Sequence, residues 1–408
     1  MRILHTADWH LGDRLGRIYR TDDLRAAVQR VAEYCKSESI DVLLVAGDLF
    51  SDLSRPDSLR ESIAHLQETF EPFLLGGGTI LALTGNHDNE TFCQTLRLVM
   101  TLAAPATGKV GELCTPGRLY LATDPSLVRL ADRSGQEVQF VLMPYPTASR
   151  YLRDGIPKSA SPQDKNRQLE RAFLTHLSGL LAHPQWHSKL PAVLSAHIHL
   201  ESVHLPSLFR ISPEDTILFD PAALPAQFAY VALGHIHQPQ AIRGLNHIRY
   251  SGSIERLDLG EQRDQKSVTL VDIGPEGMKG EPQKLPLPAT EIYAVQISDP
   301  DVELPALREQ RPDAARDLVK IDLTYTAGIH DLEKILRELY DIFPRWYERH
   351  WDEANSLGPA LTPEQAAQSR SFEETVRDYL EQELLNHPEA VKAAVLRRAE
   401  ALLHEASS

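Results

Sequence analysis

Short apolar runs alternate with helical periodicity in the first part of the chain. Residues 2–7, 41–46 and 79–84 are mostly β-branched or aliphatic, and polar or glycine residues follow each run. The run at 41–46 is continuously apolar, which is typical of a strand buried on both faces. Apolar residues at helical spacing over 23–37 and 57–74 predict helices between these strands. The alternation predicts an α/β fold with a parallel sheet.

The later pattern predicts more strands and then a second, smaller unit. Strands are expected at 138–143, 192–196, 230–233, 247–250 and 267–273, and a helix at 168–182. Prolines between 274 and 290 predict a linker. The smaller unit after it has three expected strands and one helix, at 292–297, 319–326, 345–351 and 331–340 respectively. The final segment, 371–404, has helical spacing.

Polar residues of metal-ligand type come directly after several of the predicted strands. These are Asp8 and His10, Asp48, the run Asn86-His87-Asp88, His197, and the pair His235 and His237. In an open α/β sheet the carboxyl ends of the strands line the ligand crevice. The clusters are therefore expected to meet at one site. Each cluster alone is often only a turn, since Gly, Asn and Asp are turn formers. Their joint occurrence at successive strand ends favours a functional site.

The chemistry of these side chains indicates a metal centre. Carboxylate, imidazole and amide donors without thiolate suit Mn²⁺, Fe or Zn²⁺ better than an all-oxygen Mg²⁺ or Ca²⁺ site. The donors are more numerous than one ion needs, so two ions with a bridging carboxylate are expected. Such a pair, about 3.5–4 Å apart, is the arrangement used for phosphoryl hydrolysis. Glycines before Asp48, Asn86 and His235 are expected to permit tight turns and close approach of the backbone to phosphate.

The order D-x-H, GD, GNH[DE], H and GHxH resembles the calcineurin-like metallophosphoesterase superfamily. Within it, three segments are similar to the SbcD-type nuclease subunits of SbcCD complexes, namely His5–Gly12, Val45–Phe50 and Ala232–His237. Tyr250–Ser253 and Asp258–Glu261 are similar to the segment that follows the last metal motif in that family. The resemblance implies a four-layer α/β/β/α sandwich, a small α/β capping domain and C-terminal helices.

The resemblance also implies roles for single residues and two divalent ions, with Mn²⁺ preferred. One ion would be held by Asp8, His10, Asp48 and His237. The second would be held by Asp48, Asn86, His197 and His235, with Asp48 bridging. His87 would protonate the leaving 3′-oxygen or stabilise the transition state. Asp88 would orient His87 or a neighbouring ligand.

Two positions depart from the family pattern. The fourth motif, Ser195-Ala-His-Ile-His199, offers two histidines where the family has Gly-His, and His197 is preferred because it directly follows the apolar strand. His199 and His204 are expected to be loop residues. Archaeal members have a histidine just after GDLF, where this chain has Ser51 followed by Asp52. The sequence does not show whether Ser51 or Asp52 takes over that role.

The expected organisation is a nuclease domain at 1–280, a DNA-positioning capping domain at 290–351 and C-terminal helices at 371–408. By resemblance, those helices would bind an SbcC-type ATPase; packing on their own chain is the alternative. A homodimer within a heterotetramer, formed through helices around 57–70 and 91–104, is likewise implied. The chain has 57 acidic and 42 basic residues and a net charge of −15. This charge argues against DNA binding by the chain working alone.

The resulting hypothesis is a metal-dependent 3′-5′ double-strand exonuclease and single-strand endonuclease. It would act with an SbcC-type ATPase in DNA repair, recombination and replication. The alternatives are a stand-alone phosphodiesterase or phosphatase on small phosphoesters, and a non-catalytic adaptor of the same fold. Three cysteines cannot form a disulfide framework, and the first residues lack a leader pattern. No apolar run approaches the roughly 18 residues of a membrane helix. A cytoplasmic protein with no membrane association is therefore expected.

Overall fold

A computed structural model describes the chain except at residue 53, 104–110, 153–160, residue 202, 204–216, 312–313 and most of 355–408, where only 392, 395, 396, 398 and 399 are described. Two compact units can be distinguished. The first consists of Met1–Leu323 and Glu333–Trp351, and the second of Thr324–Leu332 and Asp352–Ser408. Everything that positions the predicted site belongs to the first unit.

One six-stranded sheet carries the N-terminal strands. Its order is β16-β15-β1-β4-β5-β6, with β1 at Arg2–Thr6, β4 at Val42–Val45, β5 at Thr79–Leu83, β6 at Leu119–Ala122, β15 at Ser267–Gly274 and β16 at Gly277–Pro286. The four strands from β1 to β6 run parallel. The pair β15 and β16 is added antiparallel at the β1 edge. A late segment of the chain thus completes the sheet that the first residues begin.

A second six-stranded sheet follows the same plan. Its order is β13-β14-β12-β9-β8-β7, with β7 at Ser126–Ala131, β8 at Glu137–Met143, β9 at Ala192–His197, β12 at Tyr230–Gly234, β13 at Gln240–Ile242 and β14 at Leu245–Tyr250. The central strands β14, β12, β9 and β8 are parallel, and β13 and β7 are antiparallel edge strands. The carboxyl ends of the central strands therefore lie at one edge.

The alternation of side chains along each strand explains why the sheets stack. In β4, Val42 and Leu44 join Phe140 of β8 in the core between the sheets. Their neighbours on the opposite face, Leu43 and Val45, pack in a second core with α1 at Thr21–Ser37, α2 at Pro56–Leu75 and α3 at Glu90–Ala103. Successive strand residues point to opposite faces, so a strand covered on both sides must be apolar throughout.

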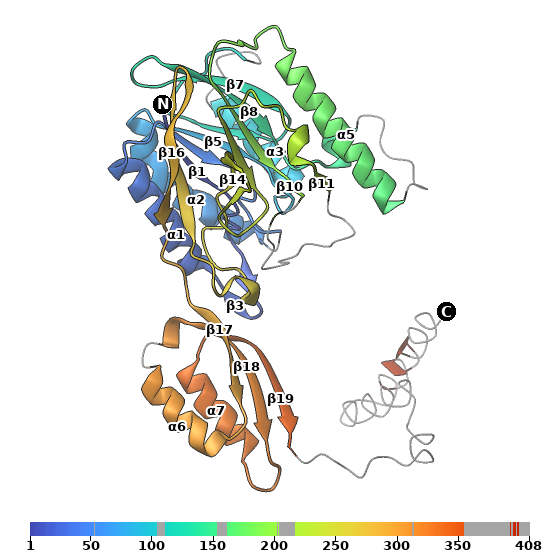
Figure 1. The fold of residues 1–408 in the computed structure, drawn as a ribbon. Helices are drawn as coiled ribbons and strands as arrows, with labels where there is room; N and C mark the ends of the chain where they lie inside the picture. Colours follow the sequence, from blue (N-terminus) through green and yellow to red (C-terminus); the bar gives the residue numbers. More distant parts are fainter. Residues whose placement is uncertain are drawn as a thin grey trace. The chain divides into compact units, whose positions relative to one another are not determined.

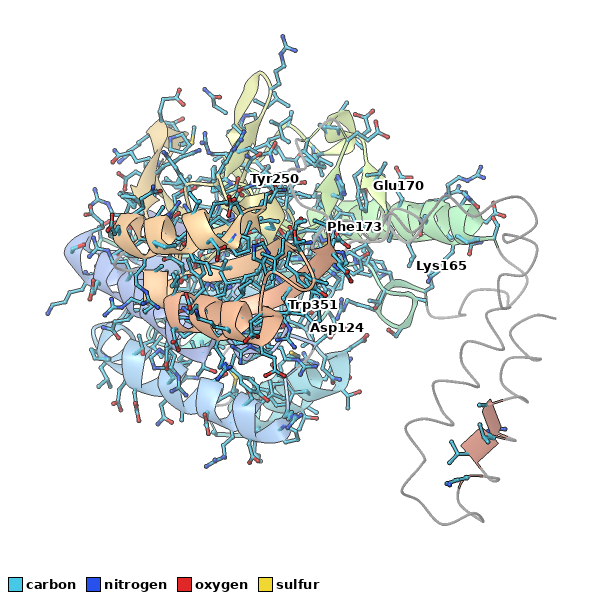
Figure 2. The ribbon with its side chains drawn as sticks, turned by 90° about the horizontal axis from the view of Figure 1, so that it is seen from below. Asp124, Lys165, Glu170, Phe173, Tyr250 and Trp351 are labelled. Atoms are coloured by element: carbon cyan, nitrogen blue, oxygen red, sulfur yellow. The ribbon has the colours of Figure 1, made fainter. Side chains whose placement is uncertain are left out.

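The outer face of the second sheet is covered by α5, Pro162–Leu181 (Figure 1). Phe173 of this helix and Tyr250 of β14 lie in the shared core, whereas Lys165 is exposed (Figure 2). The order of layers is therefore helices, sheet, sheet, helix. The predicted four-layer α/β/β/α sandwich is confirmed.

A separate three-stranded sheet follows β16. Its order is β17-β18-β19, with β17 at Ile292–Ile297, β18 at Leu318–Tyr325 and β19 at Trp346–Glu353. The helices that alternate with these strands are α6, Pro300–Gln310, and α7, Leu332–Ile342. The remaining short elements are β2 at Arg14–Leu15, β3 at Ile18–Tyr19, α4 at Ala148–Tyr151, β10 at His199–Leu200, β11 at Leu218–Phe219 and single turns of 3₁₀ helix at Pro221–Ala223, Leu259–Glu261 and Ala314–Arg316.

The linker predicted at 274–290 is wrong over most of its length, because β16 occupies Gly277–Pro286 and pairs with β15. Proline lacks an amide hydrogen, and an edge strand tolerates it on the side that has no neighbour. Most of the predicted C-terminal helices at 371–408 lie outside the described residues. Among the residues that are described, no helix is both long enough and apolar enough to span a membrane.

Candidate metal centre

The predicted site residues come together where the carboxyl edges of the two sheets meet. Asp8, Asp48 and Asn86 follow β1, β4 and β5 of the first sheet. His197 ends β9 of the second sheet, and His235 follows β12. Both sheets are parallel at these strands, so their carboxyl ends face the same way. The strand ends that the sequence pattern expects to meet at one site therefore lie together in the structure.

One group of ligand-type side chains consists of Asp8, His10 and His237. Each offers one donor atom, and these atoms lie within 4.8 Å of one another. All three side chains are buried. His10 Nε2 also lies 3.7 Å from Asp48 Oδ2, so Asp48 borders this group.

A second group consists of Asp8, Asp48 and His197. His197 Nδ1 lies 2.8 Å from the Ala46 carbonyl oxygen, which can only accept, so Nδ1 carries a proton. The other nitrogen, Nε2, lies 3.2 Å from Asp48 Oδ2 and 3.0 Å from Asn86 Oδ1. On the far side of Asn86 Oδ1, His235 Nδ1 is 3.0 Å away. Asp8 occurs in both groups, so it links them as Asp48 does.

The residues fit the divalent ions that the resemblance implies. Two ligand atoms about 2.1 Å from one ion and at right angles to each other lie about 3.0 Å apart. The 3.0–3.2 Å separations around Asn86 Oδ1 and Asp48 Oδ2 match this value. Imidazole, carboxylate and amide oxygen together are ligands for Mn²⁺, Fe or Zn²⁺.

The glycines of the motifs make room for these side chains. A Cβ on Gly47 would collide with the His197 ring, and one on Gly85 would collide with the Asp48 carboxylate and backbone. A Cβ on Gly234 would meet the Ala46 carbonyl oxygen and His197 Nδ1. Gly47 also has φ +97°, a conformation that favours glycine. The motifs therefore need glycine for close packing between the ligands, in addition to any approach of phosphate.

Buried charges in the centre shift one another's protonation. Burial raises the pKa of Asp8, and the nearby imidazoles only partly offset this. Burial alone would lower the pKa of His197, but the Asp48 and Asp8 carboxylates raise it to about 9. His235, buried and beside His197, has a pKa well below its usual value. A proton on His197 thus offsets part of the negative charge of Asp48 and Asp8, and a divalent cation would replace it.

His87 lies beside His10, and Asp88 is hydrogen-bonded to the backbone nearby. The His87 ring centroid is 5.1 Å from that of His10, and its amide nitrogen donates to Asp48 Oδ1 at 2.8 Å. Its Nδ1 is 3.5 Å from Asp52 Oδ1, on the half-exposed side chain that follows Ser51. The Asp88 carboxylate accepts from the amides of Gly85 at 2.8 Å and of Phe50 at 2.9 Å, among others. Asp88 therefore fastens the loops that carry Asn86 and Asp48.

The two histidines of the fourth motif take different places. His197 is in contact with Asp48 and Asn86, as described above. His199 is a buried residue of β10 rather than a loop residue, and only its ring approaches the centre, 5.7 Å from the His235 ring centroid. The expectation of a loop position for His199 is wrong, because the chain continues in a short strand that pairs with β11. His204 lies outside the described residues.

Other residues of the centre belong to none of the five metal motifs. Glu261 contacts His237, with 2.8 Å between Oε1 and Nδ1, and Lys266 contacts Glu261. The Tyr145 ring lies 5.8 Å from the His235 ring and 6.1 Å from the His197 ring. Only Glu261 had a signal in the sequence, since it ends a segment that resembles the family.

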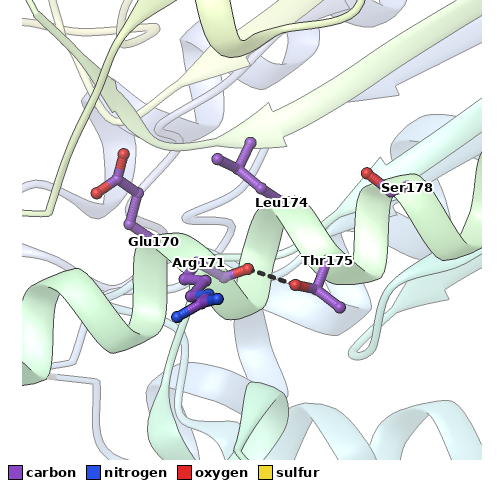
Figure 3. A pocket seen from close by; sticks show the side chains of 5 residues that line it. All are labelled: Glu170, Arg171, Leu174, Thr175 and Ser178. Carbon is purple, nitrogen blue, oxygen red and sulfur yellow. Dashed lines mark hydrogen bonds between the residues drawn. The ribbon is translucent and has the colours of Figure 1, made fainter.

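A surface hollow elsewhere takes no part in this centre. It lies along α5 and is lined by Glu170, Arg171, Leu174, Thr175 and Ser178 (Figure 3). The Thr175 hydroxyl donates to the Arg171 carbonyl oxygen at 2.8 Å, so it is satisfied within the helix. None of the predicted site residues lines the hollow.

Known proteins are similar to this chain in sequence. The family model described as calcineurin-like phosphoesterase matches residues 1–239. The SbcD subunit of the nuclease SbcCD from Rhodobacter capsulatus is 30% identical over 304 residues, covering 71% of this chain and 69% of that protein. The corresponding SbcD proteins from Bacillus subtilis and Escherichia coli are 28% and 26% identical. They cover 67% and 84% of this chain, and 67% and 83% of their own length.

The chain therefore belongs to the calcineurin-like phosphoesterase family and, within it, to the group formed by the SbcD subunits of SbcCD nucleases. The predicted resemblance is confirmed, as is the predicted class of enzyme, a phosphodiester hydrolase that depends on divalent metal ions.

Proposed function

We propose that this chain is the nuclease subunit of a DNA-processing complex. It would hydrolyse DNA phosphodiesters as a 3′-5′ double-strand exonuclease and a single-strand endonuclease, in repair, recombination and replication. The observation that carries the proposal is the convergence of Asp8, Asp48, His197 and their neighbours from five strand ends, with His87 beside them. The relatives named as SbcCD nuclease subunits support DNA as the substrate.

Two divalent ions, with Mn²⁺ preferred, are proposed for the centre. Asp8, His10, Asp48 and His237 would hold one ion; Asp48, Asn86, His197 and His235 would hold the other. Support comes from the two groups of donor atoms within 4.8 Å of one another. When bound, the ions would activate water and neutralise charge on the phosphate. Asp8 contacts both groups, so it is proposed as an additional link between the two positions.

His87 is proposed to give its proton to the leaving 3′-oxygen. An imidazole suits this role, because it gains and loses a proton near neutral pH. Its ring lies beside His10 but is only 9% exposed, so it faces the centre rather than bulk solvent. Asp88 is proposed to support catalysis by fixing the loops of Asn86 and Asp48, through the backbone hydrogen bonds described above.

The test uses the full chain, Mn²⁺ and end-labelled double- and single-stranded DNA, with and without an SbcC-type ATPase. We expect cleavage by the wild type and a loss of about 10²–10⁴ in kcat for His87→Ala, with Mn²⁺ binding retained. His183→Ala, at a histidine that follows the end of α5, is the control and should cleave normally. Hydrolysis of small phosphodiesters but not DNA would support a stand-alone phosphodiesterase instead. An adaptor would hydrolyse neither substrate.

An SbcC-type ATPase is the proposed partner, and a homodimer within a heterotetramer is the proposed assembly. On α3, Cys93 and Leu96 pack against the core, while Leu98, Val99 and Leu102 are 64%, 57% and 83% exposed. Such an apolar face is typical of an interaction surface. Leu98→Glu should shift the chain from dimer to monomer in analytical ultracentrifugation. Val302→Glu, at a similarly exposed apolar position on α6, should not. A wild-type monomer would contradict the proposed dimer.

The proposed domains are the nuclease at 1–280, the DNA-positioning cap at 290–351 and ATPase-binding helices at 371–408. The strands β17, β18 and β19 with α6 and α7 support the second assignment. The net charge of −15 supports a role for the partner in DNA binding. A cytoplasmic location is proposed with this function. Deleting 371–408 should abolish pull-down by the ATPase and leave hydrolysis of a small phosphodiester unchanged.

A further inference from the structure

The segment after β14 places a buried carboxylate in contact with one of the predicted ligands, His237. Glu261 is fully buried, and its Oε1 lies 2.8 Å from His237 Nδ1. A carboxylate accepts hydrogen bonds, so this contact places the proton of the imidazole on Nδ1. The lone pair then remains on Nε2, the nitrogen available to a metal. A backbone carbonyl, that of Ala46, does the same for His197.

The other oxygen of Glu261 is held by the protein. Lys266 Nζ, also buried, donates to Oε2 at 2.6 Å, and the Leu257 amide donates at 3.2 Å. Lys266 Nζ additionally donates to the His237 carbonyl oxygen at 3.0 Å and to Asp264 Oδ2 at 3.2 Å. The carboxylate and the backbone of His237 are thereby fixed by the same ammonium group.

This buried ion pair needs an explanation other than stability. Burying two charges removes their hydration, and their mutual attraction often does no more than offset that loss. Ligating histidines, in contrast, gain in basicity and orientation from a carboxylate on their second nitrogen. Glu261 has the position that this effect requires, and Lys266 prevents its carboxylate from turning away.

We propose that Glu261 is a positioning residue for the metal centre, and that it acts through His237. It keeps His237 protonated on Nδ1 and aims Nε2 at the position bordered by Asp8 and His10, while Lys266 holds Glu261 in place. The inference rests on the proposed metal ligands but not on DNA as the substrate. It predicts that Glu261 controls metal affinity even when no nucleic acid is present.

The test is a double-mutant cycle on the full chain. Titration calorimetry measures the binding of Mn²⁺ to the metal-free protein. Glu261→Gln should weaken the binding about 10–100-fold. In a His237→Ala background, the same substitution should change the dissociation constant for Mn²⁺ less than about twofold, because the ligand through which Glu261 acts is absent. Equal losses in both backgrounds would overturn the proposal in favour of a structural role.

Glu255→Gln is the matched control. Glu255 is a buried carboxylate of the same segment, but it accepts from the Thr290 amide and hydroxyl rather than from a ligand. It should leave Mn²⁺ affinity unchanged, and an equal loss there would contradict the proposal. Circular dichroism checks folding, and if Glu261→Gln does not fold, Glu261→Asp replaces it, with its shorter side chain drawn back from His237.

The outcomes separate this inference from the proposed function. Wild-type Mn²⁺ binding without DNA cleavage, with the cycle as expected, would reject the nuclease and retain the positioning role. DNA cleavage by a Glu261→Gln variant that binds Mn²⁺ with normal affinity would retain the nuclease and reject the positioning role. A wild type that binds no Mn²⁺ would overturn the positioning role together with the metal centre.

Discussion

Several residues of the centre have a backbone conformation that most side chains avoid. Asp8, His10, Asp48 and His235 have φ values of 53°, 45°, 52° and 94°. Each such conformation costs on the order of 1–3 kcal/mol and persists only where the surroundings enforce it. Here the Asp8 amide donates to the Gly47 carbonyl and the His10 amide to the Asp48 carbonyl, both at 3.0 Å. These backbone conformations reduce the stability of the fold, and they orient the four side chains towards the centre.

Asp52 offers a residue-scale prediction about His87. Its carboxylate lies 3.5 Å from His87 Nδ1, but its side chain is 47% exposed, so solvent screens the pair. We expect Asp52→Asn to lower kcat only a few-fold and to leave KM for DNA unchanged. Asp57→Asn, at an exposed carboxylate in the first turn of α2 that lies 4.0 Å from Arg60, should have no effect. Steady-state kinetics of both variants tests this, and a kcat equal to the wild type's in Asp52→Asn would argue against an orienting role.

His5 provides a residue-scale prediction about pH. Burial lowers the pKa of His5 to about 3, and its Nδ1 lies 3.0 Å from the Tyr230 hydroxyl oxygen. In the unfolded chain His5 is protonated below about pH 6.5, so the unfolded state binds more protons and stability falls as pH falls from 6.5 towards 3. The contribution of His5 between pH 6.5 and 5 amounts to about 2 kcal/mol.

Urea unfolding of the metal-free protein at pH 7.0 and pH 5.0 measures this effect. We expect His5→Asn to be less stable than the wild type at pH 7.0, since it removes a packed ring from β1. The variant should nevertheless lose less stability than the wild type when the pH falls from 7.0 to 5.0. If the variant and the wild type lose the same free energy of unfolding, His5 is not the responsible group.

At the scale of elements, the turns after β4 and β5 depend on small residues at the strand ends. A Cβ at Gly85 would collide with the Asp48 side chain and backbone, although Gly85 itself has no positive φ. We expect Gly85→Ala to cost about 1–3 kcal/mol of stability and to weaken Mn²⁺ binding by displacing Asp48.

Gly179→Ala is the control for this substitution. Gly179 lies in α5 with open space around its Cα, so alanine should raise stability by about 0.5–1 kcal/mol and leave Mn²⁺ binding unchanged. Thermal unfolding and calorimetry of the two variants give both readouts. Normal Mn²⁺ affinity in Gly85→Ala would mean that the turn relaxes without moving the ligand.

The elements that could be predicted best from the sequence are those buried on both faces. The run that forms β4 is apolar throughout, and those of β1 and β5 are mostly apolar, because each strand packs between helices and the second sheet. The edge strand β7 has partly exposed positions, and β16 contains prolines, so both lack the continuous apolar signal. Each of these edge strands forms by pairing with the strand next to it in the chain, β8 or β15, and not by burying both of its faces.

The same distinction applies to the centre. Asp8, Asp48 and His235 could be identified as candidates because each lies within three residues of the end of a recognisable strand. Glu261 and Lys266 follow no strand end of this kind, and they lie 24 and 29 residues beyond His237, which both contact. Their relation to the ligand depends on side-chain geometry, which no spacing along the sequence encodes.

For the whole molecule, the centre brings together buried carboxylates that a divalent cation would stabilise. Asp8 and Asp48 are both buried, and burial raises the pKa of Asp8. A ligand that binds only the folded state adds about 2.7 kcal/mol to stability at a concentration 100 times its dissociation constant. We therefore expect Mn²⁺ at 100 times its dissociation constant to raise the free energy of unfolding of the whole chain by about 2.7 kcal/mol.

The stabilisation should depend on pH in a direction set by His197. Its pKa of about 9 means that the metal-free protein holds a proton at Nε2, which Mn²⁺ must displace. Mn²⁺ should then raise the melting temperature more at pH 8 than at pH 6 at equal metal concentration. Asp48→Asn should abolish the increase, whereas Asp272→Asn, at a carboxylate 3.0 Å from Arg2 on the opposite end of the sheet, should retain it. An equal increase in both variants would place the stabilising ion outside the centre.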